Sequence, residues 1–414
     1  MEKLSEPIEK LIGRASRGDV IAKADYVIVG SGYGGAIAAL RLAHPDREVL
    51  VFERGQAYEP GDFPYDESDL PGHVRIVGNG DGQGYADALF NMHVGEQTDV
   101  LVGSGLGGTS LINAGVVETP ESRVFAKSAW PWAFRSDPTL LDDAYAAVRS
   151  LLQPRSHPFA AQLPKYRALT RLVEWLGLRS ARTSVRPASI AVSIADGPNG
   201  TGVRQNKCTD CGNCVTGCNV GAKGSLDANI WPLARSRGAS IYTNATIDHL
   251  EAARPSESSE YRYRLVISPS KQTSGNAPGE TYAVLAKNVI LAAGTLGSTG
   301  ILMRSRDHLP LSDKLGERFS TNGDGLAMSF GQSEQVNAVA SREQAEPEVE
   351  NRVGPTITGY SQIVCDNPEG LYAHAGGSND TRCASRHFSG SACDPGAASA
   401  AEREATARVS PSPR

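Results

Sequence analysis

Four of the seven cysteines fall within one short run, at Cys208, Cys211, Cys214 and Cys218, with the spacing C-x2-C-x2-C-x3-C. This spacing is known from proteins that hold iron–sulfur clusters, although there the fourth cysteine can serve a second cluster and a proline usually follows it. Here Asn219 follows, and the chain has no second run. Three interpretations stay open: an iron–sulfur cluster, packed structural thiols, and zinc. Zinc is the least favoured, because structural zinc sites generally use two separated pairs of ligands.

The second chemical signal is a glycine-rich loop in the stretch "DYVIVGSGYGGAIAALRLAHPDREVLVFERG". A short β-branched run predicts a buried parallel strand, "GAIAALRLA" predicts a helix, and "EVLVFE" predicts a second strand that ends at Glu53. Gly30 permits the tight turn, Gly32 lets the backbone approach a pyrophosphate, and Gly35 lets the helix pack on the strand. The helix N-terminus favours phosphate, and the Glu53 carboxylate can accept hydrogen bonds from a ribose. We therefore predict a dinucleotide site.

Three later stretches favour a flavin nucleotide over a nicotinamide one. Residues 100–116, "VLVGSGLGGTSLINAGV", form a second glycine-rich loop whose backbone can lie against a flat ring system. Residues 238–251 are predicted as a strand that follows a helix. Residues 287–305, "KNVILAAGTLGSTGILMRS", predict a buried strand, a turn of small residues and a helix.

With these motifs in order, the chain resembles the glucose–methanol–choline (GMC) flavin oxidoreductases, and most closely their cholesterol-oxidase-like branch. The resemblance covers about residues 20–360 and rests on "VGSGYGGAIAALRLA", "GSGLGGTSLINAGV", "CTDCGNCVTGCNVGAKGSL" and "VILAAGTLGSTGILM". It implies FAD as cofactor, a small-molecule alcohol as substrate, and oxygen or another electron acceptor. Two departures are Ser104, where the family has a basic or amide residue, and the "RSRDHLP" that follows the fourth motif.

The resemblance also assigns roles to individual residues. It implies that the pyrophosphate lies at Gly30 to Gly35, the adenosine ribose at Glu53, the flavin along the second loop, and the adenine against the backbone near Ile247. The full set of implied FAD-binding residues is Gly30, Gly32, Tyr33, Gly34, Gly35, Glu53, Arg54, Gly107, Gly108, Asn113, Ala114, Gly115, Ile247, Ala293 and Gly294.

The predicted fold class is α/β, with a Rossmann-like FAD-binding domain assembled from separated segments, a partial α+β substrate domain and a disordered C-terminal tail. We expect an N-terminal extension (1–20), the first part of the FAD-binding domain (21–125, with a lid-like loop at 58–84), a substrate or cap region (126–205), the second part of the FAD-binding domain (206–325), part of the substrate domain (326–373) and the tail (374–414). The tail has only Phe388 and Val409 as large apolar residues, which predicts disorder. It suggests a frameshifted or prematurely ended reading frame.

Composition excludes some classes of function. The formal charge of −5 offers no basic field for nucleic acid. No apolar run approaches the roughly 18 residues of a membrane span. The polar N-terminus lacks the apolar core of a secretory signal, which predicts a cytoplasmic protein.

The predicted reaction is hydride transfer from an alcohol carbon to flavin N5, with a base taking the hydroxyl proton. No catalytic base is identified, because a structural role explains His93 and His249 as well as a catalytic one does. For Trp130 and Trp132, packing is favoured over a role in lining an apolar pocket. Lys223 is expected to be solvated. The alternatives are a flavin-binding remnant without catalysis and a flavin/iron–sulfur electron-transfer module.

Overall fold

A computed structural model describes residues 3–78, 81–137, 139–177, 184–257, 259–270, 280–322, 324–325, 333, 336–338, 348–364 and 372–376 of the 414. Its largest sheet has seven strands in the order β1-β11-β3-β2-β14-β13-β12. The strands are β1 (Glu6–Pro7), β2 (Val20–Val29), β3 (Val49–Phe52), β11 (Ala239–Thr243), β12 (Ala245–Ala252), β13 (Tyr263–Pro269) and β14 (Tyr282–Leu291). The pairs from β1 to β14 are parallel, and β13 and β12 continue antiparallel.

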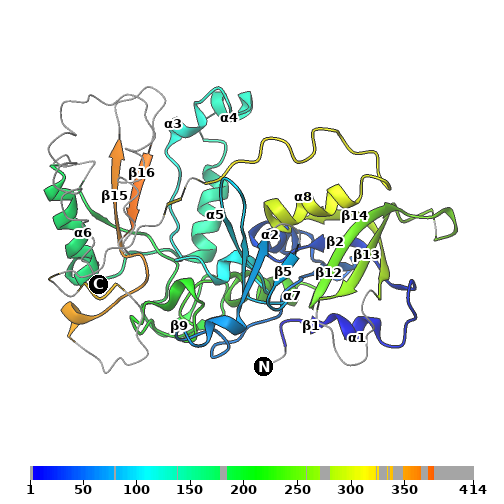
Figure 1. Cartoon of the computed structure of the whole chain (residues 1–414), viewed down its shortest axis with the longest axis horizontal. Helices are drawn as coiled ribbons and strands as arrows, with labels where there is room; N and C mark the ends of the chain where they lie inside the picture. The colour runs from blue at the N-terminus through cyan, green and yellow to red at the C-terminus, as the bar shows by residue number, and fades with distance from the viewer. Residues whose placement is uncertain are drawn as a thin grey trace, which may run out of the picture.

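The central strands are apolar on both faces because helices cover both. Val27 and Val29 of β2 belong to one core cluster together with residues of α1 (Ile8–Ile12) and α8 (Gly294–Arg304). Ile28, between them, belongs to the opposite cluster together with residues of α2 (Tyr33–Leu42) and α7 (Ile230–Ser236). This alternation explains why the strand reads as a continuous apolar run in the sequence. Figure 1 shows α2 and α8 beside this sheet.

The parallel sheet built from distant segments confirms the predicted α/β class and Rossmann-like core. The predicted strand–loop–helix–strand unit appears as β2, α2 and β3. The stretch 238–251 was expected to hold one strand, but it holds two, β11 and β12. Asn244 separates them with a left-handed φ of 56°, which breaks the extended backbone. Residues 1–20, predicted as an extension, contribute β1 and α1 to the sheet and its core.

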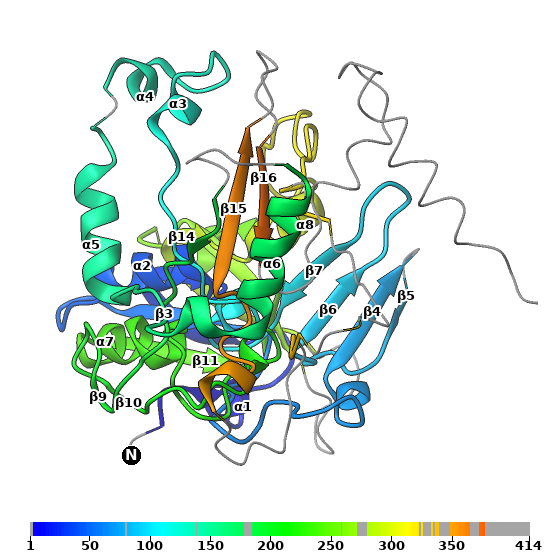
Figure 2. The same ribbon diagram turned by 90° about the vertical axis from the view of Figure 1, so that its left-hand side faces the viewer.

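A second sheet, in the order β5-β4-β6-β7, lies beside the first (Figure 2). It consists of β4 (Val74–Gly78), β5 (Asp81–Gln83), β6 (Phe90–His93) and β7 (Val100–Gly103). The stretch 58–84, predicted as a lid-like loop, therefore includes two strands. The glycines and prolines of this stretch indicated a loop, so the short, mostly apolar run "VRIV" of β4 was not recognised as a strand.

The remaining α-helices and β-strands lie within residues 119–205 and in the later part of the chain. They are α3 (Ser122–Phe125), α4 (Trp132–Ser136), α5 (Asp142–Leu152), α6 (Pro164–Trp175), β8 (Arg186–Pro187), β9 (Gly197–Pro198), β10 (Arg204–Gln205), β15 (Gly359–Val364) and β16 (Tyr372–Gly376). The last two strands and β8 form a small sheet in the order β16-β15-β8. The predicted tail begins at 374, but 374–376 belong to β16. Residues 377–414 lie outside the described residues, and the domain boundaries stay predictions.

Of the two tryptophans in this region, Trp130 packs against other rings as expected, whereas Trp132 does not follow the expectation of packing. Trp132 is 73% exposed, and Trp130 is 37% exposed while contacting the rings of Phe125 and Phe134. Among the described residues, no helix is both long and apolar enough to cross a membrane.

Neighbouring glycines of α2 provide a test of the strand–helix contact. A Cβ at Gly35 would lie 2.0 Å from the Gly30 carbonyl oxygen, whereas a Cβ at Gly34 would meet only the Ala292 methyl at 3.8 Å. Gly35→Ala is expected to lower the free energy of unfolding by about 2–3 kcal/mol, because backbone must move. Gly34→Ala is expected to leave it unchanged or raise it by up to about 1 kcal/mol, since alanine favours the helix. Urea unfolding of both variants measures this, and equal effects would contradict the packing argument.

Candidate functional site

The first glycine loop joins β2 to α2 and is held against the end of β14. Gly30 has a φ of +96°, and a Cβ there would lie 2.5 Å from the Ala292 carbonyl oxygen. Ala293 and Gly294, both predicted to contact the cofactor, follow at this same end of β14. At Gly32, by contrast, a Cβ would meet nothing within 4 Å. The loop is therefore tight on its protein side and open above Gly32, at the N-terminus of α2, where a phosphate is favoured.

Ser31 lies between these glycines and joins four parts of the chain. It is fully buried, and its hydroxyl lies 2.6 Å from Glu53 Oε2 and 3.1 Å from the Gly105 carbonyl, while it accepts a hydrogen bond from the Gly107 N–H at 2.9 Å. The indole N–H of Trp231 donates to the Ser31 carbonyl at 2.9 Å. Sequence reasoning missed this residue. Its one signal was its place between two glycines of the fingerprint, where a small side chain is needed.

Glu53 is at the end of β3, as predicted, and only 7% exposed. Its carboxylate accepts hydrogen bonds from the Ser31 N–H at 3.0 Å and the Gly55 N–H at 2.8 Å. The next residue, Arg54, donates to Asn91 of β6 at 3.2 Å, and burial lowers its pKa. The first loop, β3 and the second sheet therefore meet at these two charged residues.

The second glycine loop packs directly on the first. A Cβ at Gly108 would lie 3.0 Å from Gly32 Cα, so the two loops touch through glycine backbones. The amide of Asn113 donates to the Tyr33 hydroxyl at 2.8 Å and accepts from the Gly115 N–H at 3.0 Å. The structure thus brings the predicted residues of both loops together.

Ile247 lies on β12, which is tied to the same site through its first residue. The Ala245 N–H donates to the Glu53 carbonyl at 2.9 Å. Ile247 is two residues further along and 4% exposed. The contact of its backbone with adenine stays a prediction.

Lys223 is not solvated, which corrects the expectation from the sequence. It is 2% exposed, and its ammonium group donates to the carbonyls of Leu111 at 3.0 Å, Cys214 at 2.9 Å and Asn113. Burial lowers its pKa to about 8. Lys223 therefore binds the second glycine loop to the cysteine run. A lysine between glycines on a polar stretch carries no sequence signal for such burial.

The four cysteines are free thiols that surround one small cavity, with Lys223 in its wall. Burial raises the pKa of Cys208 well above its ordinary value and also raises that of Cys211. Nearby, Asp210 takes a left-handed φ of 61° and pairs with buried His157 at 3.0 Å. A second buried lysine, Lys165, donates to the carbonyls of residues 354–356, and burial lowers its pKa to about 8. The run is thus a cluster of partly buried thiols beside the second loop.

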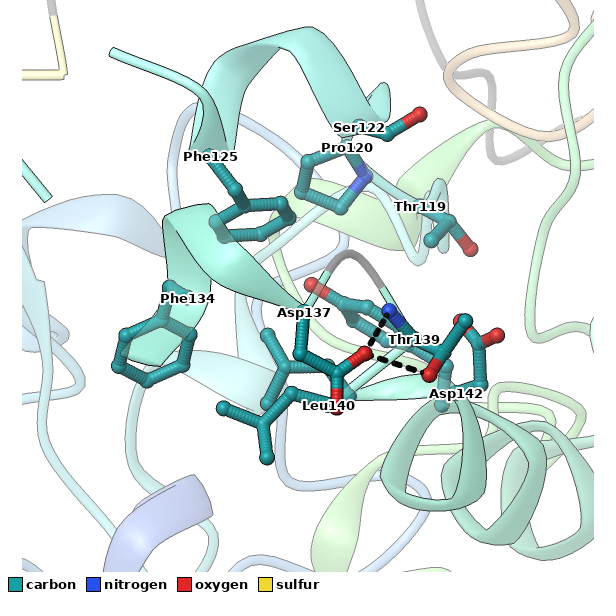
Figure 3. Close-up of a pocket in the computed structure, with 11 residues that line it drawn as sticks. Thr119, Pro120, Ser122, Phe125, Phe134, Asp137, Thr139, Leu140 and Asp142 are labelled. Carbon is teal, nitrogen blue, oxygen red and sulfur yellow. Dashed lines mark hydrogen bonds between the residues drawn. The ribbon is translucent and has the colours of Figure 1, made fainter. Parts of the chain in front are cut away.

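A larger cavity of about 310 Å³ lies elsewhere, between the stretch before α3 and the start of α5 (Figure 3). Phe125 and Phe134 give it an apolar wall. The Asp137 carboxylate accepts the Thr139 hydroxyl at 2.6 Å and the Thr139 N–H at 2.9 Å. Neither Trp130 nor any residue of the glycine loops lines it.

A family model described as GMC oxidoreductase matches residues 24–311. The chain is 26% identical over 322 residues to a cholesterol oxidase of Acinetobacter baumannii, covering 73% of this chain and 54% of that protein. It is 29% identical over 322 residues to a cholesterol oxidase of Mycobacterium tuberculosis, covering 73% and 52%. A long-chain-alcohol oxidase of Arabidopsis thaliana is 24% identical over 290 residues, covering 68% and 34%. The chain spans about half the length of the two cholesterol oxidases.

Two solved structures are similar over part of the chain. A pyridoxine 4-oxidase from Mesorbium loti has a TM-score of 0.37 and 18% identity, covering 68% of this chain and 51% of that one. A formate oxidase of Aspergillus oryzae has a TM-score of 0.40 and 16% identity, covering 70% and 48%.

The lowered pKa of Lys223 makes stability depend on pH in a predictable direction. Between about 8 and its ordinary value of 10.5 the unfolded chain carries a proton on this lysine that the folded chain has lost. Unfolding then takes up a proton, so this lysine makes the fold more stable as pH rises through that window. From pH 7.5 to pH 10, the unfolding free energy of the natural chain should therefore rise relative to that of Lys223→Met, by up to about 3 kcal/mol.

Urea unfolding at several pH values measures this difference. The exposed Lys207, in the same stretch, gives the control Lys207→Met, for which we expect no trend. A flat difference for Lys223→Met would show that the ammonium group keeps its proton in the folded chain throughout.

Proposed function

This chain belongs to the GMC oxidoreductase family, and from that membership we propose that it binds FAD and takes part in the oxidation of the CH–OH group of an apolar alcohol such as a sterol. The observation that carries the proposal is the contact of two glycine loops at Gly32, with Ser31 and Glu53 buried beneath it. This arrangement leaves space above Gly32 and places acceptor oxygens at the end of β3, which suits a dinucleotide.

The residues present fit FAD. The open face of Gly32 accepts a pyrophosphate, and the first amides of α2 donate to it. The Oε1 oxygen of Glu53 accepts one hydrogen bond, from the Gly55 N–H, so it can accept a second hydrogen bond from a ribose hydroxyl. Residues 113–115 provide backbone for the flavin ring. When bound, FAD supplies an acceptor for a hydride at N5.

The substrate class follows from the relatives and remains part of the proposal. Oxidation removes a hydride from the alcohol carbon and a proton from its oxygen, so a carbonyl forms and two electrons pass to the cofactor. The names cholesterol oxidase and long-chain-alcohol oxidase support an apolar alcohol, in steroid or other lipid metabolism. Oxygen or another acceptor then takes the electrons. A flavin-binding protein without catalysis is the competing proposal.

FAD binding is tested at the open glycine. We expect the chain to bind FAD and Gly32→Ala to weaken that binding at least tenfold, because a methyl group enters the space reserved for the pyrophosphate. Gly300→Ala in α8 is the matched control, since its Cβ would meet only the end of the Arg304 side chain, at 3.4 Å. Quenching of flavin fluorescence on titration gives both affinities. Equal affinities of Gly32→Ala and the natural chain would place the pyrophosphate elsewhere.

Substrate oxidation is tested on the same FAD-loaded chain under anaerobic conditions. Addition of cholesterol or a long-chain primary alcohol is expected to bleach the flavin absorption as two electrons enter. A chain that binds FAD but is bleached only by dithionite would support the non-catalytic alternative.

The cysteine cluster favours a second candidate, a flavin/iron–sulfur electron-transfer module. Four free thiols around one cavity and the two buried ammonium groups of Lys165 and Lys223 suit an anionic metal–thiolate group. If this is correct, protein purified anaerobically shows a broad brown absorption beneath the flavin bands and binds iron, and Cys214→Ser removes both while FAD remains. Flavin bands alone, without bound iron, would leave the cysteines as structural thiols.

A further inference from the structure

A group of potential metal ligands lies on the antiparallel side of the large sheet, apart from both glycine loops. His249 and Glu251 are two residues apart on β12, so their side chains share one face of the strand. His308 follows α8 in the next turn of chain. One ligand atom from each of these three residues lies within 4.8 Å of the other two, and this is the one such group of three among the described residues.

The turn that carries His308 is fixed to β12. The fully buried Ser305 hydroxyl accepts a hydrogen bond from the Leu250 N–H at 2.9 Å and donates to the Ile301 carbonyl at 2.7 Å. The His308 ring stacks on the His249 ring with centroids 4.6 Å apart.

His249 is oriented as a metal ligand is. Its Nδ1 lies 2.7 Å from Asp248 Oδ2, and the other oxygen of Asp248 lies 3.1 Å from Arg304 Nε. Metal-bound histidines usually make such a carboxylate contact through the nitrogen that does not bind the ion, which leaves Nε2 of His249 to face it. Nε2 lies 3.2 Å from Glu251 Oε1. Two ligands on one tetrahedral zinc ion are about 3.3 Å apart, given bonds of about 2.0–2.1 Å.

The positive charges around Glu251 lie on its other oxygen. Arg264 Nε is 3.6 Å and Arg254 Nη2 is 3.8 Å from Oε2. These contacts hold the carboxylate with Oε1 toward His249. The carboxylates of Asp248, Glu251 and Glu257 offset the charges of Arg304, Arg254 and Arg264 around the site.

We propose that His249, Glu251 and His308 bind one divalent transition-metal ion of the zinc type, with water as the fourth ligand. Two imidazoles and one carboxylate form a donor set that zinc uses in proteins. The ion would link β12 to the chain that follows α8. Because His308 is exposed, its ring can turn to present a nitrogen once the ion is on His249 and Glu251.

The test is Zn²⁺ titration of the whole chain by calorimetry. Since the thiols can bind zinc too, the measured quantity is the loss of one site in His308→Asn relative to the natural chain. His308 is exposed and outside the core, so this variant should fold normally. Asp248→Asn should weaken the same site by about 10- to 100-fold. His44→Asn is the control, because His44 pairs with Asp46 without a second histidine.

Co²⁺ identifies the ligands independently. The site lost in His308→Asn should show only weak visible bands, without the intense near-ultraviolet absorption of thiolate ligation. The proposal fails if His308→Asn binds as many Zn²⁺ ions as the natural chain with the same affinities, which would leave adventitious or cysteine binding only. It also fails if the natural chain binds no Zn²⁺.

Discussion

The hydrogen bonds of one buried serine connect the two glycine loops with the end of β3 and with α7. Ser31 has no exposed surface, and its hydroxyl and backbone contact the end of β3, the second glycine loop and the indole of α7. These segments are far apart in the sequence. A hydroxyl both donates and accepts, so one small side chain can satisfy a carboxylate and a backbone N–H at once. Alanine would leave the Gly107 N–H without its hydroxyl partner in a buried place, at a cost of about 1–3 kcal/mol, while Glu53 would keep its bonds from the Ser31 and Gly55 N–H groups.

Two glycine contacts lie next to the hydrogen bonds of Ser31. Gly35 lets α2 approach β2, and Gly108 lets the second loop touch Gly32. Each contact is possible because the glycine has no side chain there, whereas the position of a Cβ on Gly32 stays open. These two backbone contacts border the open side of Gly32, and a side chain at Gly108 would press against the Gly32 Cα.

The local motifs could be predicted from the sequence, but the contacts between them could not. The strands around Gly30 and Glu53 are visible because apolar runs and glycines at fixed offsets report local geometry. The two strands within 58–84 and the split of 238–251 were missed, since glycine-rich segments and an Asn in left-handed conformation have no apolar pattern. Ser31 and Lys223 were missed or misjudged, because burial of a polar residue depends on partners more than 70 residues away.

A domain made of separated segments needs connections that do not rely on adjacency, and buried lysines provide two of them. Lys223 joins three carbonyls from the second loop and the cysteine run, and Lys165 of α6 joins carbonyls that precede β15. An ammonium group has three donors and no acceptor, so it suits a place where loop carbonyls converge without strands to pair them. Its burial lowers its pKa, and that cost explains why each lysine is fully coordinated. The Lys223 ammonium group therefore links the cysteine run to the proposed flavin loop. Its pKa depends on the charge of the nearby thiols, with or without a bound cluster.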